Sequence, residues 1–334
     1  MIVGYESALD FWRATRAAYG GRDVLDPEGR VFGARQLSSA EQASLAINLC
    51  ASEDPLDVVL KSREGRHGLP SVRDHVWRAP LTDEHLQGLG NGIFVCKMPV
   101  VLCQLASSWD VLEVAEVACE MAGTYGVTPW SDRGFEGNME PLVDLAEFRG
   151  YASAAKALRV RGAARAVSAL DLSAACSNSP RESDVAIFFL QSRALGGVGL
   201  AGFTMNRRLD LPESLVELTG RKYLVPDFMW DNGTIVEYDS EQEHLSPEAR
   251  ARDEAKRRAF QAEGLDWLTL TNGILRSNSL LNLFVRDLEE SLGLTRRPLS
   301  AAMEARRTTL RERLFGQESV EASLKALSGT SESL

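Results

Sequence analysis

The alternation of apolar and polar positions is clearest across residues 226–239, where two apolar-rich runs flank an Asp-Asn-Gly sequence that ends at Gly233. Asn-Gly between two alternating runs predicts a β-hairpin. A three-residue loop with Gly233 in the left-handed conformation places Asp227 directly opposite Glu237. A two-residue Asn-Gly turn is the alternative, and it places Asp227 opposite Tyr238 instead.

The three-residue loop sorts the side chains of this hairpin onto two faces, because successive side chains of a strand point in opposite directions. One face carries the carboxylates Asp227, Glu237 and Asp239. The other face carries Phe228, Trp230, Val236 and Tyr238, which we expect to pack on a core. Acids directly opposite each other repel, and a divalent cation offsets this because hard cations bind carboxylate oxygens. The pattern therefore predicts a metal site; exposed acids on an edge hairpin are the alternative.

Elsewhere the periodicity predicts both strands and helices, so the fold class is α/β, or α+β overall. Strands are predicted at residues 56–60, 72–77, 92–95, 203–209, 222–230, 234–239 and 266–270. Helices are predicted from near Ser39, at 99–105 and 111–125, two or three times within 141–175, around Glu182, and at 247–263, 278–292 and 298–315. The glycines at 196–199 are predicted to form a loop, Gly264 to end a helix, and the final Ser/Glu-rich residues to be disordered.

The amino-acid composition is that of an ordinary globular protein, and its net charge argues against one class of nucleic-acid-binding function. The chain has 334 residues, 44% of them hydrophobic and 25% charged, with a formal net charge of −10. This acidity argues against broad nonspecific coating of nucleic acid, which depends on basic surfaces. It leaves room for local basic segments, and one such segment carries Lys156, Arg159, Arg161 and Arg165.

The cysteines and the N-terminal residues favour a cytoplasmic location. Five cysteines are scattered without paired metal-ligand spacing, and an odd number of them favours buried thiols in a reducing compartment. The N-terminal residues lack the charged-then-apolar pattern of a secretory signal, and no apolar run approaches the length of a membrane span. We expect a cytoplasmic protein that does not enter membranes.

Residues of about 179–293 carry a set of short motifs in a fixed order. These are Glu182 on a helix, Pro226-Asp227-Phe228, Glu237-Tyr238-Asp239, His244 after a short loop, an Arg/Asp/Arg-rich helix at 252–258 that includes Lys256, and a strand from residue 266. The set resembles the core of PD-(D/E)XK nucleases, in particular the compact branch similar to very-short-patch-repair endonucleases. Two departures are Asp239, where many nucleases of the superfamily carry lysine, and Ser240, where the compact branch usually has glycine.

This resemblance implies a restriction-endonuclease-like mixed sheet flanked by helices and a Mg²⁺- or Mn²⁺-dependent endodeoxyribonuclease activity. Asp227 and Glu237 would be metal ligands, and Asp239 a third ligand or an outer-shell base. His244 would act as general base or position the leaving group. The remaining two implied catalytic residues are Glu182, acting on the metal through a water, and Lys256, supplying the charge that is missing at Asp239. An exposed surface residue is the alternative at each of these last four positions.

The N-terminal part differs in character from this region. His75-Val76-Trp77 before a Gly-Ile-Phe-Val strand and a following helix resembles the small α+β domain of abortive-infection antitoxins. The expected division is an antitoxin-like domain at 1–126, a helical linker at 127–178, a nuclease domain at 179–297, and a C-terminal helix and tail at 298–334. The histidines His67, His75 and His85 show no ligand spacing.

Two functions follow as hypotheses. The first is a metal-dependent DNA endonuclease of bacterial defence, repair or a mobile element. The second is a non-catalytic, antitoxin-like DNA-binding regulator that keeps a nuclease fold as scaffold. DNA is the expected partner in both, and both leave room for a homodimer or a partner protein.

Overall fold

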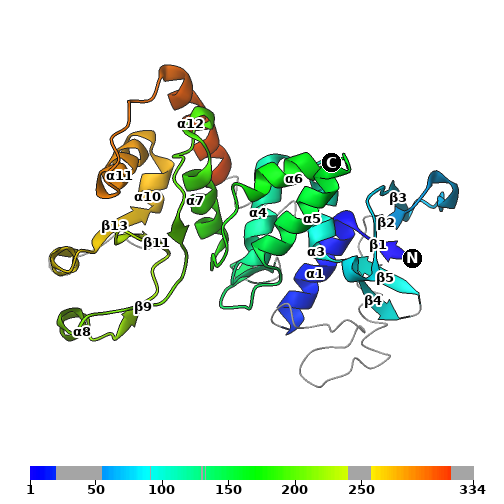
Figure 1. The fold of residues 1–334 in the computed structure, drawn as a ribbon, viewed down its shortest axis with the longest axis horizontal. Coiled ribbons are helices and arrows are strands. Elements are labelled where there is room, and N and C mark those ends of the chain that lie inside the picture. The colour runs from blue at the N-terminus through cyan, green and yellow to red at the C-terminus, as the bar shows by residue number, and fades with distance from the viewer. Residues whose placement is uncertain (20–54, 91, 129–130, 132, 240–256, 317–334) are drawn as a thin grey trace. The chain divides into compact units, whose positions relative to one another are not determined.

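The computed structural model describes residues 1–19, 55–90, 92–128, 131, 133–239 and 257–316. Contacts within the chain separate two compact units, which divide between Ser183 and Asp184 (Figure 1). Residues 127–178, which the sequence predicts to be a linker, are counted with the first unit. The predicted helix start near Ser39, His244, Lys256 and the predicted disordered tail lie outside the described residues.

The first unit contains a mixed five-stranded sheet in the order β3-β2-β1-β5-β4. Its strands are β1 (Ile2–Val3), β2 (Leu56–Leu60), β3 (Val72–Val76), β4 (Leu86–Gly90) and β5 (Ile93–Cys96). β1 is parallel to β5 and antiparallel to β2, and β2 is parallel to β3. The strands predicted at 56–60, 72–77 and 92–95 are confirmed within one residue. β1 and β4 are strands that the sequence pattern did not predict.

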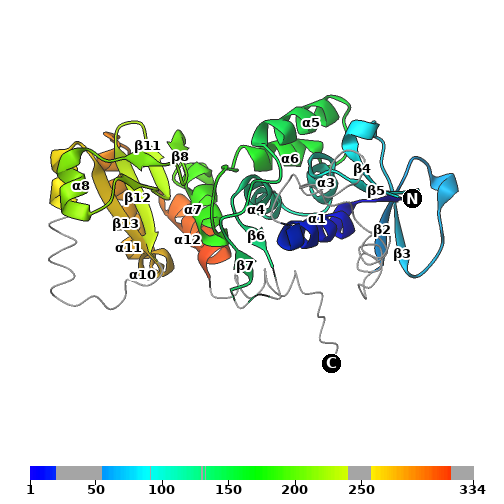
Figure 2. The same ribbon diagram turned by 90° about the horizontal axis from the view of Figure 1, so that it is seen from below.

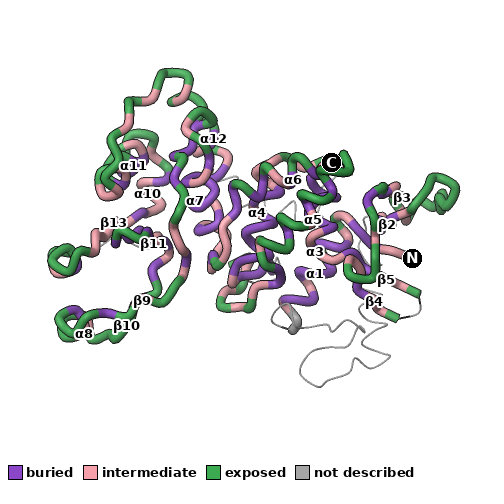
Figure 3. Tube along the Cα trace, in the orientation of Figure 1, coloured by how far each residue is buried: buried purple, intermediate pink, exposed green. Residues whose placement is uncertain are grey.

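Helices gather on one side of this sheet (Figures 1 and 2). They are α1 (Tyr5–Tyr19), α3 (Met98–Leu105), α4 (Val111–Ala122), α5 (Leu145–Ala157) and α6 (Ala163–Leu170). α3 is buried at nearly every position, and the purple positions of Figure 3 follow it and α4. α1 packs on α3 and β2. The predicted helices at 99–105, 111–125 and 141–175 are confirmed in kind, whereas α1 was not predicted. The short strands β6 (Gly126–Val127) and β7 (Phe135–Glu136) form an antiparallel ribbon after α4.

A buried ion pair fastens α1 to α4. Arg13 Nη2 lies 2.6 Å from Glu120 Oε2, and both side chains are almost fully buried. Glu120 Oε1 also accepts a hydrogen bond from the Val127 N–H at 3.1 Å. Arg16 donates to the carbonyls of Glu120 and Gly123 at 2.8 Å. The Glu120 carboxylate, near the end of α4, therefore connects this helix to α1 through Arg13 and to the β6–β7 ribbon through Val127.

The second unit contains a four-stranded sheet in the order β13-β12-β11-β8. Its strands are β8 (Phe203–Thr204), β11 (Phe228–Trp230), β12 (Thr234–Asp239) and β13 (Asp266–Thr271). β8, β11 and β12 are antiparallel neighbours, and β13 runs parallel to β12. The strands predicted at 234–239 and 266–270 are confirmed.

The strand predictions at 203–209 and 222–230 are wrong in their extent. β8 ends at Thr204, and Asn206 then adopts a positive φ of 48°. β9 (Leu209–Asp210) pairs with β10 (Tyr223–Leu224) in a separate ribbon, with the unpredicted helix α8 (Glu213–Thr219) between them. The sheet is interrupted here because the chain leaves it to build this excursion, which packs its own small cluster around Leu215 and Phe260.

Aromatic side chains fill one face of the four-stranded sheet. Phe189 of α7 (Pro180–Leu190) contacts Phe228 and Trp230, with ring centroids 5.2 and 5.8 Å apart. α11 (Asn278–Ser291) follows α10 (Asn272–Arg276), and Ser291 hydrogen-bonds the Thr234 hydroxyl at 2.8 Å. The apolar face predicted for the hairpin is therefore the packed one.

The last helix, α12 (Ala301–Phe315), is part of this unit. The buried Arg307 guanidinium donates to the carbonyls of Gly196 and Gly197 at 3.0 and 2.7 Å and to Asn282 Oδ1 at 3.0 Å. Gly196 has a φ of +98°, and a Cβ there would lie 2.6 Å from the Arg307 backbone nitrogen. The predicted glycine loop is confirmed, and α12 covers it. No helix among the described residues is both long enough and apolar enough to cross a membrane.

Candidate metal site on the β11–β12 hairpin

The hairpin adopts the register of the three-residue loop. Phe228 is paired with Val236 and Met229 with Ile235. Extending this register by one residue beyond the start of β11 sets Asp227 opposite Glu237. Gly233 has a φ of +89°, the left-handed conformation that glycine tolerates without a steric cost. The prediction is confirmed, and the two-residue turn that would place Asp227 opposite another residue is excluded.

Contacts around Gly233 explain why this register is fixed. A Cβ at Gly233 would lie 2.5 Å from the Gly264 carbonyl oxygen. The Gly233 carbonyl in turn accepts a hydrogen bond from the Asp266 N–H at 3.0 Å. Gly264, predicted to stop the preceding helix, follows the helical residues 257–262 with a φ of +76°. The turn of the hairpin is therefore held against the start of β13.

The Asp227 carboxylate is oriented by the backbone of the neighbouring strand. Asp227 Oδ2 accepts a hydrogen bond from the Tyr238 N–H at 2.7 Å. Asp227, Glu237 and Asp239 are all half-buried. Strand alternation places Glu237 and Asp239 on one face of β12, and the register extended to Asp227 places its side chain beside them. On the other face Phe228 is fully buried, but Tyr238 is only half-buried and its hydroxyl donates to Asn272 Oδ1 at 2.9 Å.

The pair of Asp227 and Glu237 suits a magnesium ion. Residues directly opposite in an antiparallel pair have Cβ atoms about 5 Å apart, so two carboxylates can approach one cation. Mg²⁺ is typically held by one or two carboxylates and keeps several waters. Within the described residues, no group of three or more His, Cys, Asp or Glu side chains is placed to hold a metal ion. Asp239 lies about 7 Å farther along β12, and its role as a third ligand stays a prediction.

Hydroxyl groups flank the acids on the adjacent strand. In the parallel pairing of β12 with β13, Glu237 is in register with Thr269 and Asp239 with Thr271. Thr271 Oγ1 accepts a hydrogen bond from the Ile274 N–H at 3.3 Å and caps α10. Sequence reasoning did not single out these threonines, because their position beside the acids depends on a pairing between strands separated by a crossover.

Glu182 has local partners at the start of α7. Its carboxylate accepts hydrogen bonds from the Ser179 hydroxyl at 2.9 Å and the Asn178 N–H at 2.8 Å. The Glu182 N–H donates to Ser179 Oγ at 3.2 Å. The Ser179 side chain caps the first turn as in a capping box, but the Glu182 carboxylate accepts from the Asn178 N–H and the Ser179 hydroxyl. Pro180 occupies the first helical position. These contacts show that Glu182 stabilises the N-terminus of α7. Its action on the metal through a water stays a prediction.

The predicted basic segment divides into structural and solvent-facing residues. Arg165 donates to the carbonyls of Ala106 and Trp109 at 2.8 and 2.7 Å, which fixes α6 to the end of α3. The other three residues of this segment are exposed to solvent: Lys156, Arg159 and Arg161.

A second polar cluster, which the sequence did not reveal, lies in the first unit. His75 Nε2 lies 2.7 Å from Asp57 Oδ1, and Asp57 is buried. The two residues are 18 positions apart and meet because β2 and β3 pair in parallel. His75 was given no partner from spacing, and no short-range signal could have supplied one.

Comparison of the chain with protein-family models, with curated proteins and with solved structures finds no match.

Proposed function

We propose that this protein is a Mg²⁺-dependent endodeoxyribonuclease, with the acidic face of the β11–β12 hairpin as its active site and a restriction-endonuclease-like fold in the second unit. The observation that carries the proposal is the β11–β12 register, which sets Asp227 opposite Glu237 when it is extended by one residue. The order of elements also supports it, because α7, β11, β12, the helical residues 257–262 and β13 follow one another as the nuclease resemblance implies.

The residues of the hairpin have separable tasks in this proposal. A Mg²⁺ ion held by these carboxylates would lower the pKa of a bound water and stabilise negative charge on the scissile phosphate. Asp227 is held in a fixed orientation by the Tyr238 N–H, so a ligand is in place before substrate arrives. Glu237 supplies the opposing carboxylate, and Asp239 is the proposed third ligand or outer-shell base on the same face. His244 and Lys256 are the proposed proton acceptor and the proposed positive charge.

The decisive experiment compares isosteric neutral variants. Asp227→Asn keeps an oxygen that can accept from the Tyr238 N–H, and Glu237→Gln keeps the side-chain volume. Asp231→Asn is the matched control, because Asp231 is an exposed acid in the same hairpin. Purified protein is incubated with supercoiled, linear, mismatched and single-stranded DNA, with Mg²⁺, Mn²⁺ or chelator. We expect metal-dependent cleavage that falls at least about a hundredfold in the two site variants and is unchanged in the control.

Calorimetric titration with Mn²⁺ examines the metal assignment separately from activity. Wild type and Asp231→Asn should bind Mn²⁺ alike, and Asp227→Asn should bind it more weakly. Equal Mn²⁺ binding by all three proteins would remove the metal assignment. Folded protein that binds duplex tightly but leaves every substrate intact across both metals and a range of pH would remove the catalytic proposal.

The alternative is a DNA-binding regulator, and one observation favours it. Asp239 stands where many nucleases of the superfamily carry lysine, so the acidic face has no lysine of its own on β12. A regulator should bind DNA without divalent metal, and charge reversals in the first unit should weaken that binding most. Its affinity should fall as salt rises, since phosphate contacts release counterions.

A further inference from the structure

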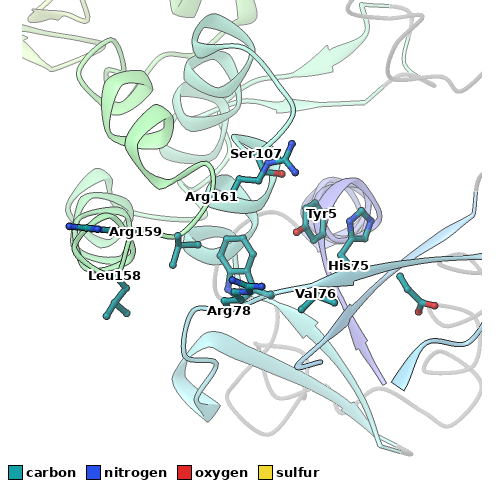
Figure 4. A pocket seen from close by; sticks show the side chains of 11 residues that line it. Tyr5, His75, Val76, Arg78, Ser107, Leu158, Arg159 and Arg161 are labelled. Atoms are coloured by element: carbon teal, nitrogen blue, oxygen red, sulfur yellow. The ribbon is translucent and has the colours of Figure 1, made fainter. Parts of the chain in front are cut away.

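A pocket of about 660 Å³ opens in the first unit, far along the chain from the proposed nuclease site. β3 and the residues just after it form one wall, and the turn between α5 and α6 forms another (Figure 4). Its volume lies within the range of small-molecule sites and suits a ligand of nucleotide size.

Arginines give this pocket a positive charge. Arg78, Arg159 and Arg161 line it, and none of the three makes an ion pair with an acid of the described residues. Among the described lining residues the one acid is Asp74, which is already engaged by His67 through a backbone and a ring contact, each of 2.7 Å. Three arginines therefore line a cavity whose one described acid is already occupied, an arrangement that suits an anion.

The turn that carries two of these arginines is held rigidly. Gly162 has a φ of +88°, and a Cβ there would lie 2.5 Å from the Cys103 carbonyl oxygen and 2.6 Å from the Ser107 nitrogen. The Val160 N–H donates to the Ala155 carbonyl at 3.0 Å. The backbone of Arg161 thereby lies between two anchored residues, Val160 and Gly162.

The opposite wall is an aromatic and hydrogen-bonded assembly. Tyr5 stacks on His75 with ring centroids 3.8 Å apart, and His75 Nε2 contacts the buried Asp57. Tyr5 has a φ of 52°, and its N–H donates to Gln104 Oε1 at 2.8 Å. A non-glycine residue with positive φ is strained, and such strain concentrates at functional sites.

The Tyr5 hydroxyl is a hydrogen-bond donor in this setting. Burial, with smaller effects of Cys96 and Asp57, raises the pKa of Tyr5 to about 12, while Arg161 acts in the opposite direction. The phenol is therefore protonated at neutral pH and can donate to an acceptor oxygen. Figure 4 shows Tyr5 and His75 on one side of the pocket, with Arg161 and Arg78 approaching from other elements.

We propose that this pocket binds the phosphate group of a mononucleotide-sized phosphate monoester, with Arg161 and Arg78 as the principal contacts and Tyr5 as a neutral donor. A doubly charged monoester matches the excess of guanidinium groups better than a single diester phosphate does. The volume of about 660 Å³ is of the size of one nucleotide. The inference does not depend on the endonuclease proposal.

Isothermal titration of the full chain in the presence of chelator provides the test. The four nucleoside 5′-monophosphates are compared with their nucleosides, which lack only the phosphate. At least one monophosphate should bind, and its nucleoside should bind at least about tenfold more weakly, because a hydrogen bond to a charged group is lost. Arg161→Ala and Arg78→Ala should each weaken the monophosphate at least about tenfold. Arg66→Ala is the matched control, since Arg66 is exposed in the same unit and outside the pocket.

Several results would overturn the inference. One is that no monophosphate binds more tightly than its nucleoside, and another is that Arg66→Ala loses as much affinity as Arg161→Ala. Arg161→Lys, which keeps the charge, guards against a folding defect and should retain part of the affinity. A 5′-phosphorylated oligonucleotide that binds over tenfold more tightly than every mononucleotide would overturn the assignment to a free nucleotide. Asp227→Asn should leave nucleotide binding unchanged, which separates this outcome from that of the nuclease proposal.

Discussion

Replacing Gly233 by alanine should damage the hairpin that carries the proposed metal ligands more than the same change at Gly264. Both glycines have positive φ, +89° and +76°. Alanine in the left-handed region costs about 1–2 kcal/mol, and the reduced freedom of the unfolded chain offsets about 0.4–1 kcal/mol of this. Gly264→Ala should therefore destabilise the second unit by only about 1 kcal/mol, since a Cβ added at Gly264 would meet no other atom within 4 Å.

Gly233→Ala has a steric cost in addition to the conformational cost that it shares with Gly264→Ala. Its Cβ would lie 2.5 Å from the Gly264 carbonyl oxygen, a backbone atom that cannot rotate away. Overpacking of this kind typically costs about 1–3 kcal/mol. The expected difference between the two variants is therefore about 1–3 kcal/mol, with Gly233→Ala the less stable.

Hydrogen exchange of the β12 amides measures the difference where it arises, because exchange reports local opening as well as global unfolding. A chain with two compact units does not have one well-defined unfolding free energy, so a global melting temperature is a weaker readout. The amides of residues 234–239 should exchange faster in Gly233→Ala than in Gly264→Ala. Equal exchange in the two variants would refute the close approach of the hairpin turn to the start of β13.

Three other predictions concern buried polar groups. Arg13→Met should destabilise the first unit by about 3–5 kcal/mol, because Glu120 stays buried without its ion-pair partner. In chemical denaturation, the Arg13→Met/Glu120→Met double variant should recover much of the lost stability. A double variant whose loss equals the sum of the two single losses would contradict the pairing. Alkylation of the native protein at pH 8 should modify the exposed Cys176 and spare the buried Cys96, and mass spectrometry detects the difference. The reason is that burial raises the pKa of Cys96 to about 12. Modification of both cysteines at the same rate would contradict the burial of Cys96. Arg307→Met should raise protease sensitivity of the second unit, and an unchanged digestion pattern would show that its three hydrogen bonds contribute little.

The sequence predicted the hairpin because its signals are local. Gly233 and the alternation beside it determine the turn, and the turn determines that Asp227 faces Glu237. The same local reasoning placed β2, β3, α3, α4 and α11 nearly correctly, since each has a periodic pattern and a recognisable start or stop.

Features that depend on distant partners were not predictable in this way. α1 was missed because its buried face includes Arg13 and Arg16, whose partners lie more than 100 residues away. Charged residues in such positions hide the apolar period that identifies a helix. The contact of His75 with Asp57 likewise requires knowledge of which strands pair. Local pattern contains no information on either feature.

The contact of α12 with the glycine loop has a consequence for where the second unit can be cut. A fragment ending at residue 297, the boundary that the nuclease resemblance suggests, would lack Arg307 and Phe315. The carbonyls of Gly196 and Gly197 would lose their donors, and Phe188 would lose its ring contact with Phe315. The smallest independently expressed form of the hairpin unit should therefore extend through residue 316, and a shorter one should accumulate as insoluble protein.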